Sequence, residues 1–542
     1  GLDAMVLGNH EFDAGLDKLA NFIANVNFPL LAANVDISAE PALADVTLLP
    51  YQLFKLEQQQ LTPLAELPDV GREQLVAVFG LALEDMASIT PLTGAVTFQS
   101  EIATAQRTVD ELTALGVKHI IAVTHLGHQR DLLLAQAVNG IDVIVGGHSH
   151  SLLGDFRQWF KGQPGDYAQL ITNADGLNYT CVVQAGEFAQ AIGAVRLEFN
   201  VAGQLTRCEG ENTILASNNF YQRPSRNAQS AVSETEQQQL AHFVDAMPNT
   251  SITAEHGALR QLLDTQYLPA VQQAYGAKIA EVEQPLQHVR LPGTGGSDQH
   301  GSILAGHVAD GFYYWLNSAA VQEVTGKKVD FTLVGAGNIR SDLQAGDLYQ
   351  GHIFLEVLPF AAPLSVVQVT GAELKALLLQ VISDTLPEGA HAGKFPYSSH
   401  LRFSVIEHAA GQASFTQLQW RDKGQWHDIA PEQHYTLGVT SYLADGNDGW
   451  YLLAQAIARA GQRVDLVLQQ GQPQAFKVQS MQPLQTANPT SAYRSLYTTV
   501  PALPCDPPLF DCRVAAQAVI NYVQAHPEVL SQPRQPTVTL LR

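Results

Sequence analysis

Positive charge is scarce in this chain of 542 residues. Lysine and arginine together number 30, whereas aspartate and glutamate number 52, which gives a formal net charge of −22. A surface this acidic repels phosphate backbones and therefore argues against a nucleic-acid partner. An anionic substrate must be attracted locally instead, by a few arginines or by bound metal ions.

Long apolar runs are absent as well. No uninterrupted apolar run in the sequence approaches the roughly 18–20 residues that a membrane-spanning helix needs. The stretches at 75–79 and 120–123 have only the length of buried strands. We therefore expect no transmembrane segment. Hydrophobic residues make up 46% of the chain and charged residues 15%, which is typical of a well-buried globular protein.

Cysteine is rare, and its spacing does not suit a metal site. Cys181 and Cys208 form one sequence-local pair, Cys505 and Cys512 form another, and neither pair has the CxxC spacing. Two interpretations stay open. The four residues are separate buried thiols, or they form two disulfides in an oxidising compartment.

The length indicates two or three domains at roughly 100–200 residues per domain. Residues 1–200 alternate short apolar strands with helices, as in layered α/β domains. A Gln-, Ser- and Asn-rich stretch follows, and then a helical stretch at 257–275. We expect a first domain over 1–225, a linker with a connecting helix over 226–276 and a second domain over 277–542.

The hydrophobic periodicity predicts individual elements within these domains. Helices are expected at 16–26, 102–115, 132–138, 303–317 and 371–383, and strands at 74–82, 118–124, 142–145, 329–335, 364–370 and 435–440. We also expect a strand near Val357 and two antiparallel strands within 179–200.

Three short polar segments each follow an apolar strand. They are Gly-Asn-His-Glu-Phe-Asp at 8–13, Thr-His-Leu-Gly-His at 124–128 and Gly-Gly-His-Ser-His at 146–150. Ligands in open α/β sheets bind at the carboxyl ends of strands, so all three segments are expected at one rim. A lone histidine at a strand end is usually an ordinary polar residue, but three such segments in this order favour metal catalysis.

Imidazole and amide ligands suit Zn, Mn or similar ions, and two ions ~3.5–4 Å apart can clamp a phosphoryl displacement. His148 and His150 are two apart and would share a face of a plain strand, while the glycines before them allow a sharp turn. His10 and Asp13 are three apart at a helix start, which lets the carboxylate hold the imidazole. His128 fits a supporting or surface position better than a ligand position.

The second domain carries candidates for binding a small anionic ligand. Gly337 lies in a glycine-rich segment that allows close approach, and Arg340 offers a two-pronged contact to phosphate or carboxylate. Phe360 and Tyr442 lie on separate loops and could sandwich a base, worth about 1–3 kcal/mol per stacked base, while Asp448 could accept hydrogen bonds from a ribose. For each aromatic residue taken alone, core packing is the commoner explanation.

The three polar segments resemble the metallophosphoesterase signature. Their order, with the second domain behind them, is similar over nearly the whole chain to the periplasmic 5′-nucleotidase/UDP-sugar hydrolase family. The segment Val289-Arg290-Leu291-Pro292 resembles the NAD nucleotidase branch of that family. The resemblance implies a four-layer α-β-β-α metallophosphoesterase domain, joined by a helical linker to an α+β 5′-nucleotidase C-terminal domain.

The same resemblance implies specific roles for single residues. Asn9, His125 and His148 would bind one metal, His150 would help to bind the other, and His10, oriented by Asp13, would stabilise the transition state. In the second domain Phe360 and Tyr442 would stack on the base and Asp448 would bind the ribose. Arg290 and Arg340 would bind the anionic groups.

This chain departs from the family at its start. Members of the family carry an Asp-x-His motif and a Gly-Asp motif ahead of the Gly-Asn-His segment, and these motifs complete both metal sites. We therefore expect an N-terminally truncated domain whose intact parent binds two divalent ions, such as Zn, Mn or Co. At most one well-ligated metal site is expected in this chain, together with little or no hydrolase activity.

The leading hypothesis is hydrolysis of nucleoside 5′-phosphates in nucleotide catabolism, extended to the pyrophosphate of NAD or UDP-sugars. One alternative is a 2′,3′-cyclic-nucleotide phosphodiesterase with 3′-nucleotidase activity. Another is a nucleotide-binding relic without activity. Cysteine pairing and the habit of the family indicate a periplasmic or extracellular location.

Overall fold

The structure is a computed structural model that describes residues 2–57, 60–68, 74–90, 92–159, 161–221, 231–294, 297–387, 390–408, 411–484, 490–505 and 510–542. The chain divides into two compact units. Unit 1 comprises Gly1–Asn218 and Glu234–Ala254, and unit 2 comprises Asn219–Ser233 and Glu255–Arg542. The expected boundary between 225 and 226 lies outside the described residues. In the part that the structure describes, no helix is both long enough and apolar enough to cross a bilayer.

The elements of unit 1, in chain order, are β1 (Met5–Val6), η1 (His10–Phe12), α1 (Leu16–Asn25), β2 (Leu30–Leu31), β3 (Val35–Asp36), η2 (Pro41–Leu43), β4 (Tyr51–Glu57), β5 (Gln60–Leu64), β6 (Leu75–Ala82), η4 (Met86–Ser88), β7 (Thr97–Phe98), α2 (Glu101–Ala114), β8 (His119–His125), α3 (His128–Ala137), β9 (Val143–Val145), η5 (Arg157–Trp159), β10 (Gln169–Thr172), β11 (Tyr179–Val183), β12 (Ala191–Phe199), β13 (Leu205–Ser217), α4 (Glu234–Asp245) and β14 (Thr250–Thr253).

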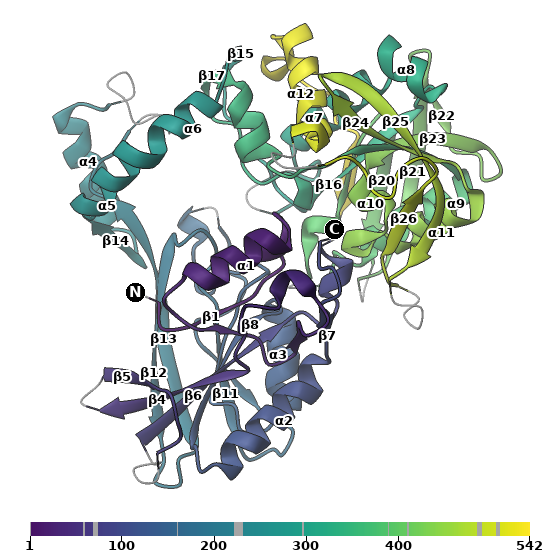
Figure 1. Cartoon of the computed structure of the whole chain (residues 1–542). Coiled ribbons are helices and arrows are strands. Elements are labelled where there is room, and N and C mark those ends of the chain that lie inside the picture. The colour runs from purple at the N-terminus through teal and green to yellow at the C-terminus, as the bar shows by residue number, and fades with distance from the viewer. Residues whose placement is uncertain are drawn as a thin grey trace. The chain divides into compact units, whose positions relative to one another are not determined.

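Two facing sheets form the centre of unit 1. The larger sheet has the order β10-β11-β9-β8-β6-β4-β5, and the smaller one has the order β12-β13-β14. β6 reads Leu-Val-Ala-Val-Phe-Gly-Leu-Ala and lies between β8, which is parallel to it, and β4, which is antiparallel. It is buried along its whole length, as expected for an interior strand covered on both faces. Helices α2 and α3 pack on the larger sheet, and α4 packs on β14 (Figure 1). The predicted mixed α/β fold is confirmed.

A disulfide joins the two sheets. Cys181 in β11 is bonded to Cys208 in β13, beside a small buried cluster that includes Val143 and Val183. Cys505 and Cys512 form the second disulfide. The interpretation of the four cysteines as separate thiols is therefore wrong.

The elements of unit 2, in chain order, are α5 (Gly257–Leu262), η6 (Leu263–Tyr267), α6 (Leu268–Ala274), β15 (Lys278–Val282), α7 (Ile303–Leu316), α8 (Ala319–Thr325), β16 (Phe331–Gly335), η7 (Ala336–Asn338), β17 (Gly346–Tyr349), η8 (His352–Val357), β18 (Leu364–Thr370), α9 (Gly371–Ser383), η9 (Ala392–Lys394), β19 (Pro396–Ser399), β20 (Leu401–Glu407), β21 (Ala413–Asp422), β22 (Gln425–Asp428), β23 (His434–Thr440), α10 (Ser441–Ala444), η11 (Asn447–Gly449), α11 (Tyr451–Ala460), β24 (Arg463–Gln469), β25 (Gln472–Pro483), β26 (Tyr493–Tyr497), η12 (Phe510–Cys512), α12 (Val514–Ala525), η13 (Val529–Ser531) and β27 (Val538–Leu541).

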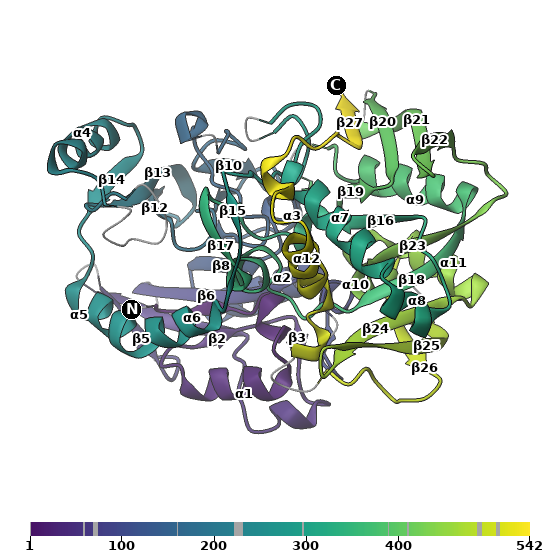
Figure 2. The same cartoon turned by 90° about the horizontal axis from the view of Figure 1, so that it is seen from above.

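Unit 2 is built on a mixed sheet with the order β19-β16-β23-β18-β24-β25-β26, and a second sheet has the order β22-β21-β20-β27. α7 packs on β16, β19 and β23, and α12 lies beside α7 (Figure 2). α9 begins at a capping box, in which Thr370 and Glu373 bond to each other's backbone N–H groups. The short elements η7 and η11 both lie near η9, and they carry the candidate substrate-binding residues Gly337 and Asp448.

Two local predictions are wrong. The strands found within 179–200, β11 and β12, do not pair with each other. β11 pairs with β9 and β10, whereas β12 pairs with β13 in the other sheet. The stretch that ends at Val357 is the π-helix η8 and not a strand. The first error arises because a short apolar run does not reveal its partner strand, and the second because such a run does not distinguish a helix from a strand.

Candidate functional site

The strand ends of unit 1 bring three predicted metal ligands together. Asn9 follows β1, His125 ends β8 and His148 follows β9, the parallel neighbour of β8. The Oδ1 atom of Asn9 lies 2.9 Å from Nε2 of His125. The ring centroids of His125 and His148 are 5.0 Å apart. The parallel strands thus deliver side chains from three distant segments to one place, as expected for this type of sheet.

Glycine is required beside these ligands because the backbone approaches an imidazole closely. A Cβ atom on Gly8 would lie 2.6–2.8 Å from the ring atoms of His125. One on Gly147 would lie 3.4 Å from Nδ1 of the same ring. Real Cβ contacts essentially never fall below 3.0 Å, so the first glycine cannot be replaced without moving His125.

His125 is kept in the form that can bind a metal. Burial, followed by the positive charges of His10 and His150, lowers the pKa of His125 to about 4. The ring is therefore neutral at physiological pH and retains a nitrogen lone pair. An amide oxygen and two imidazoles form a donor set that suits Zn or Mn.

His10 and Asp13 form the predicted pair at the start of unit 1. Nδ1 of His10 lies 2.7 Å from Oδ2 of Asp13. Their side chains are 41% and 38% exposed. The carboxylate fixes the orientation of an imidazole that solvent and a substrate can reach.

His148 and His150 do not lie on a strand. Both adopt left-handed backbone conformations, with φ of 72° and 59°, so this segment turns sharply after the glycines and is not the plain strand on which the two histidines would share a face. Nδ1 of His150 lies 2.6 Å from a carboxylate oxygen of Glu187. Metal-binding histidines commonly bond a carboxylate through one nitrogen and the metal through the other. Glu187 could not be predicted from the sequence, because no motif surrounds it.

The donor set present fits one divalent ion. Asn9, His125 and His148 are adjacent and supply three ligands, the number that catalytic zinc sites use together with a water molecule. Over the described ranges, no three His, Cys, Asp or Glu side chains form a metal-binding group. Of the predicted ligands, His150 alone is left for a second ion.

His128 is part of the support for the third segment. It starts α3 and is only 3% exposed, so the surface alternative is wrong. Its backbone N–H donates to Oγ of Ser149, 3.0 Å away. Burial lowers the pKa of His128, so the ring stays neutral.

In unit 2 the structure brings Gly337, Arg340 and Phe360 together. The Arg340 guanidinium carbon lies 5.7 Å from the centroid of the Phe360 ring. Nη1 of Arg340 donates to the carbonyl oxygen of Gly337 over 3.3 Å. The positive charge of an arginine is attracted to the quadrupole of an aromatic ring. Here Arg340 places that charge beside the Phe360 ring, on which a base can stack.

Asp448 faces the same group of residues. A Cβ atom on Gly337 would lie 3.3 Å from Oδ2 of Asp448 and 3.2 Å from the backbone of Gly393. Asp448 has a left-handed φ of 56°, and its Oδ1 atom lies 3.8 Å from Nδ1 of His391. His391 and Gly393 were not predicted from the sequence. The available signal was the run His391-Ala-Gly-Lys394, one residue before the buried strand β19.

His288 supports the turn before Gly337 from within the segment that carries Arg290. The two nitrogens of His288 lie 2.9 Å from Oγ of Ser302 and from the carbonyl oxygen of Ala336. Burial, followed by the positive charges of Arg290 and Arg340, lowers the pKa of His288 to about 3. The neutral ring therefore donates to Ala336, the residue before Gly337, and fixes that turn.

Tyr442 belongs to the short helix α10 at the start of the loop 441–450, which also carries Asp448, and does not lie on irregular backbone as predicted. Its carbonyl oxygen accepts a hydrogen bond of 2.9 Å from the side chain of Asn447. This bond closes the loop between the predicted stacking residue and the predicted ribose ligand.

Comparison with known sequences gives a consistent result. The sequence model described as "5'-nucleotidase, C-terminal domain" matches residues 295–455. A Treponema pallidum protein named "Probable 5'-nucleotidase" is 29% identical over 478 residues, which cover 85% of this chain and 75% of that protein. The trifunctional nucleotide phosphoesterase of Bacillus subtilis is 28% identical over 84% of this chain but only 28% of its own length. The NAD 5'-nucleotidase of Haemophilus influenzae is 26% identical over 82% of this chain and 70% of its own length.

Solved structures share the fold. The 5'-nucleotidase precursor of Thermus thermophilus superposes with a TM-score of 0.68 at 24% identity and covers 100% of this chain and 84% of its own. A sulfate thiohydrolase from the same organism, in complex with glycerol, has a TM-score of 0.56 at 14% identity and covers 100% of this chain and 73% of its own. Because proteins with such different names share this fold, the fold alone does not assign a substrate.

Proposed function

This chain belongs to the 5′-nucleotidase family, whose members are hydrolases of phosphoric esters, and from that premise we propose that it hydrolyses nucleoside 5′-phosphates to nucleoside and phosphate. The observation that carries the proposal is the grouping of Arg340, Phe360 and Asp448 around Gly337. The positive charge of Arg340 suits the phosphate of a nucleotide, the ring of Phe360 suits its base, and the carboxylate of Asp448 suits its ribose.

The nucleoside is recognised by unit 2. Phe360 and Tyr442 stack on the base, each contact being worth about 1–3 kcal/mol. Asp448 accepts hydrogen bonds from the ribose hydroxyls. Arg340 and Arg290 attract the anionic part of the substrate, which the net charge of −22 would otherwise repel.

The chemistry is assigned to unit 1. A divalent ion at Asn9, His125 and His148 would supply Lewis acidity and lower the pKa of a bound water. His10, held by Asp13 at 2.7 Å, donates a hydrogen bond to the phosphoryl oxygen on which charge develops. His150, held by Glu187, presents its other nitrogen at the same strand ends.

Hydrolysis of a pyrophosphate is the second candidate function. The Haemophilus relative is named an NAD 5'-nucleotidase, and it covers most of this chain. The match to the Bacillus relative spans only 28% of that protein's length, so we do not extend the activities of the whole relative to this chain.

The test is release of phosphate by the purified chain from AMP, NAD, UDP-glucose and 2′,3′-cyclic AMP, with Mn²⁺, Zn²⁺ or Co²⁺ and with a chelator. We expect release from AMP that the chelator abolishes, because Asn9, His125 and His148 supply the three protein ligands that one catalytic ion needs. Such release would overturn the expectation, drawn from the sequence, of little or no hydrolase activity in this chain. A His10→Asn variant should lose about 100-fold or more in kcat. If the chain binds adenosine but hydrolyses none of the four substrates with any of the three metals, the proposal is refuted and the protein is a nucleoside-binding protein.

We also propose a periplasmic or extracellular location. The two disulfides, Cys181–Cys208 and Cys505–Cys512, support it because such bonds persist in oxidising compartments. Fractionation of the native host, followed by thiol labelling of the protein, would test this assignment.

A further inference from the structure

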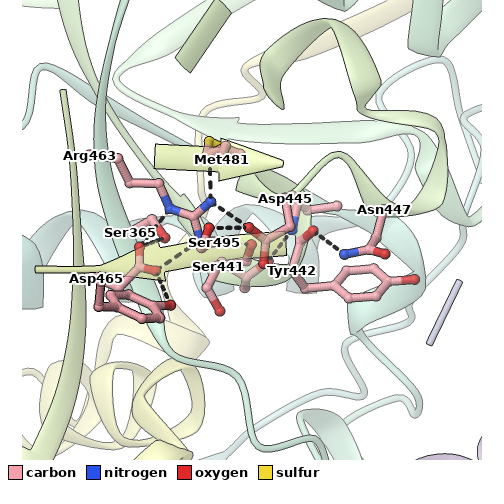
Figure 3. A network of polar contacts seen from close by, with 12 residues as sticks. Ser365, Ser441, Tyr442, Asp445, Asn447, Arg463, Asp465, Met481 and Ser495 are labelled. Atoms are coloured by element: carbon pink, nitrogen blue, oxygen red, sulfur yellow. Dashed lines mark hydrogen bonds and ion pairs between the residues drawn. The ribbon is translucent and has the colours of Figure 1, made fainter. Parts of the chain in front are cut away.

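A buried polar network lies directly behind the loop that carries Tyr442 and Asp448. Its centre is Arg463, the first residue of β24, whose side chain is fully buried. Figure 3 shows the guanidinium between two carboxylates, Asp465 on one side and Asp445 on the other. Tyr442 and Asn447 lie beyond Asp445 in that view. The network therefore connects a strand of the main sheet with the proposed nucleoside-binding loop.

Arg463 uses both ends of its guanidinium group. On the sheet side, Nε and Nη2 donate to the two carboxylate oxygens of Asp465 over 2.7 and 2.9 Å. On the loop side, Nη1 donates to Oδ1 of Asp445 over 2.6 Å, and Nη2 donates to the carbonyl oxygen of Ser441 over 3.3 Å. Only arginine offers this many donors in a fixed planar fork, so lysine could not make the same set.

Hydroxyl groups complete the network. Ser365 and Tyr497 donate to Asp465, over 2.5 and 2.8 Å. Ser495 donates to Oδ1 of Asp445 over 2.7 Å. Three hydroxyls and one guanidinium thus donate to the two carboxylates. The two carboxylates carry one more negative charge than the guanidinium can neutralise, and the hydrogen bonds from the hydroxyls compensate for it.

The loop held by the network is conformationally demanding. Within residues 441–450, Gly446, Asp448 and Gly449 have left-handed φ angles of 84°, 56° and 78°. A non-glycine residue such as Asp448 keeps this conformation only where its surroundings impose it. Asp445 is anchored just before this stretch, through its side chain and through its carbonyl oxygen, which accepts from the backbone of Tyr493 over 2.7 Å.

We propose that Arg463 is a positioning residue for nucleoside binding: it ties Asp445 and Ser441 to β24 and thereby holds Tyr442 and Asp448 in the geometry that receives the base and ribose. The proposal rests on the proposed function for the identity of the ligand. Its structural part, the ordering of residues 441–450 by Arg463, stands on the network alone.

Four variants separate positioning from general stabilisation. Arg463→Lys removes the fork, and Asp445→Ala removes the anchor on the loop. Asp445→Asn keeps an oxygen that can accept from Arg463 and Ser495, so it serves as the conservative rescue. Tyr497→Phe removes one hydrogen bond on the sheet side only and is the matched control.

Three measurements apply to each folded variant: adenosine affinity by calorimetry, deuterium uptake of residues 441–450, and the melting temperature. We expect Arg463→Lys and Asp445→Ala to weaken adenosine binding about tenfold, to raise uptake in the loop and to raise KM for AMP more than they lower kcat. Asp445→Asn should stay within about threefold of the wild type. Tyr497→Phe should lower the melting temperature without changing loop uptake.

The outcomes distinguish this proposal from the proposed function. Unchanged loop uptake in Arg463→Lys and Asp445→Ala would overturn the positioning role, and so would equal loosening of the loop in Tyr497→Phe. If Arg463→Lys fails to fold, Asp445→Ala against Asp445→Asn still decides the question. Wild-type protein that binds no adenosine would refute the proposed function, while the exchange data would still decide the positioning.

Discussion

At the scale of single residues, the contact between His150 and Glu187 gives Glu187, which lies outside every motif, the role of orienting a histidine. Nδ1 of His150 is engaged over 2.6 Å, which leaves Nε2 to point elsewhere. Carboxylates in this arrangement orient a metal-binding imidazole and increase its basicity.

Glu187→Ala is expected to weaken the binding of a second divalent ion by about tenfold or more, because His150, the predicted ligand left for that ion, loses its partner. The ion at Asn9, His125 and His148 should bind as before. Competition of Mn²⁺ or Zn²⁺ with a fluorescent chelator measures this directly, without reference to turnover. Glu198→Ala is the matched control, since Glu198 lies in the same unit and pairs with Arg196 and Arg207 at the surface. Equal metal affinity in the two variants would contradict the role of Glu187.

Gly8→Ala is expected to displace the ring of His125, because the new methyl group would lie 2.6–2.8 Å from its atoms. The contact of 2.9 Å with Asn9 should then be lost, and with it metal affinity and AMP hydrolysis. Gly257→Ala is the control, because a Cβ atom there meets nothing within 4 Å. A crystal structure of Gly8→Ala with an undisplaced His125 would show this expectation to be wrong.

At the scale of elements, the sequence predicts an element well where local pattern and capping agree. The helix expected at 371–383 is found over the same residues, because Thr370 and Glu373 cap an amphipathic run. The strand expected at 74–82 is found as Leu75–Ala82. The pairing within 179–200 was not predictable, since strand partners depend on contacts distant in sequence.

The candidate site shows the same limit. Asn9 and His125 could be placed together from sequence because each follows a strand of a parallel arrangement. Glu187 and His391 could not, because both reach the candidate residues only through the tertiary fold. The left-handed conformation of His148 was also hidden, since it is imposed by its surroundings and not by residue type.

α7 carries a buried histidine whose titration should affect stability. His307 is 3% exposed, and burial lowers its pKa from 6.5 to about 4. Between these values the unfolded chain binds more protons than the folded one, so stability is present above pH 6.5 and falls as the pH drops toward 4.

His307→Leu should remove that contribution. From pH 7 to pH 5 the wild type should lose roughly 1–2 kcal/mol more unfolding free energy than the variant. Urea titrations at both pH values measure the difference. The surface variant His408→Leu is the control and should keep the wild-type dependence; a His307→Leu protein with an unchanged pH dependence would contradict this account.

At the scale of the whole molecule, each unit has its own main hydrophobic core, and unit 1 has two smaller buried clusters besides. The proposed nucleoside residues belong to unit 2 and the proposed metal ligands to unit 1. A ligand that binds only the folded form of one unit stabilises that unit, by about 2.7 kcal/mol at a hundredfold excess over Kd.

Calorimetry should therefore resolve two unfolding transitions that respond to different ligands. We expect adenosine to raise one transition and Mn²⁺ or Zn²⁺ to raise the other. Asp448→Ala should abolish the adenosine shift and spare the metal shift, whereas His125→Ala should do the reverse. A single transition raised by both ligands would show that the two units unfold as one body.

The contact between Asn9 and His125 joins residues 116 positions apart in the chain. Such a long loop must close before the two side chains meet, so the contact belongs to a late stage of folding. An ion that needs both residues gains nothing from a partly folded chain. It should therefore leave the rate of folding nearly unchanged and lower the rate of unfolding, so the metal would increase the kinetic stability of the folded unit 1.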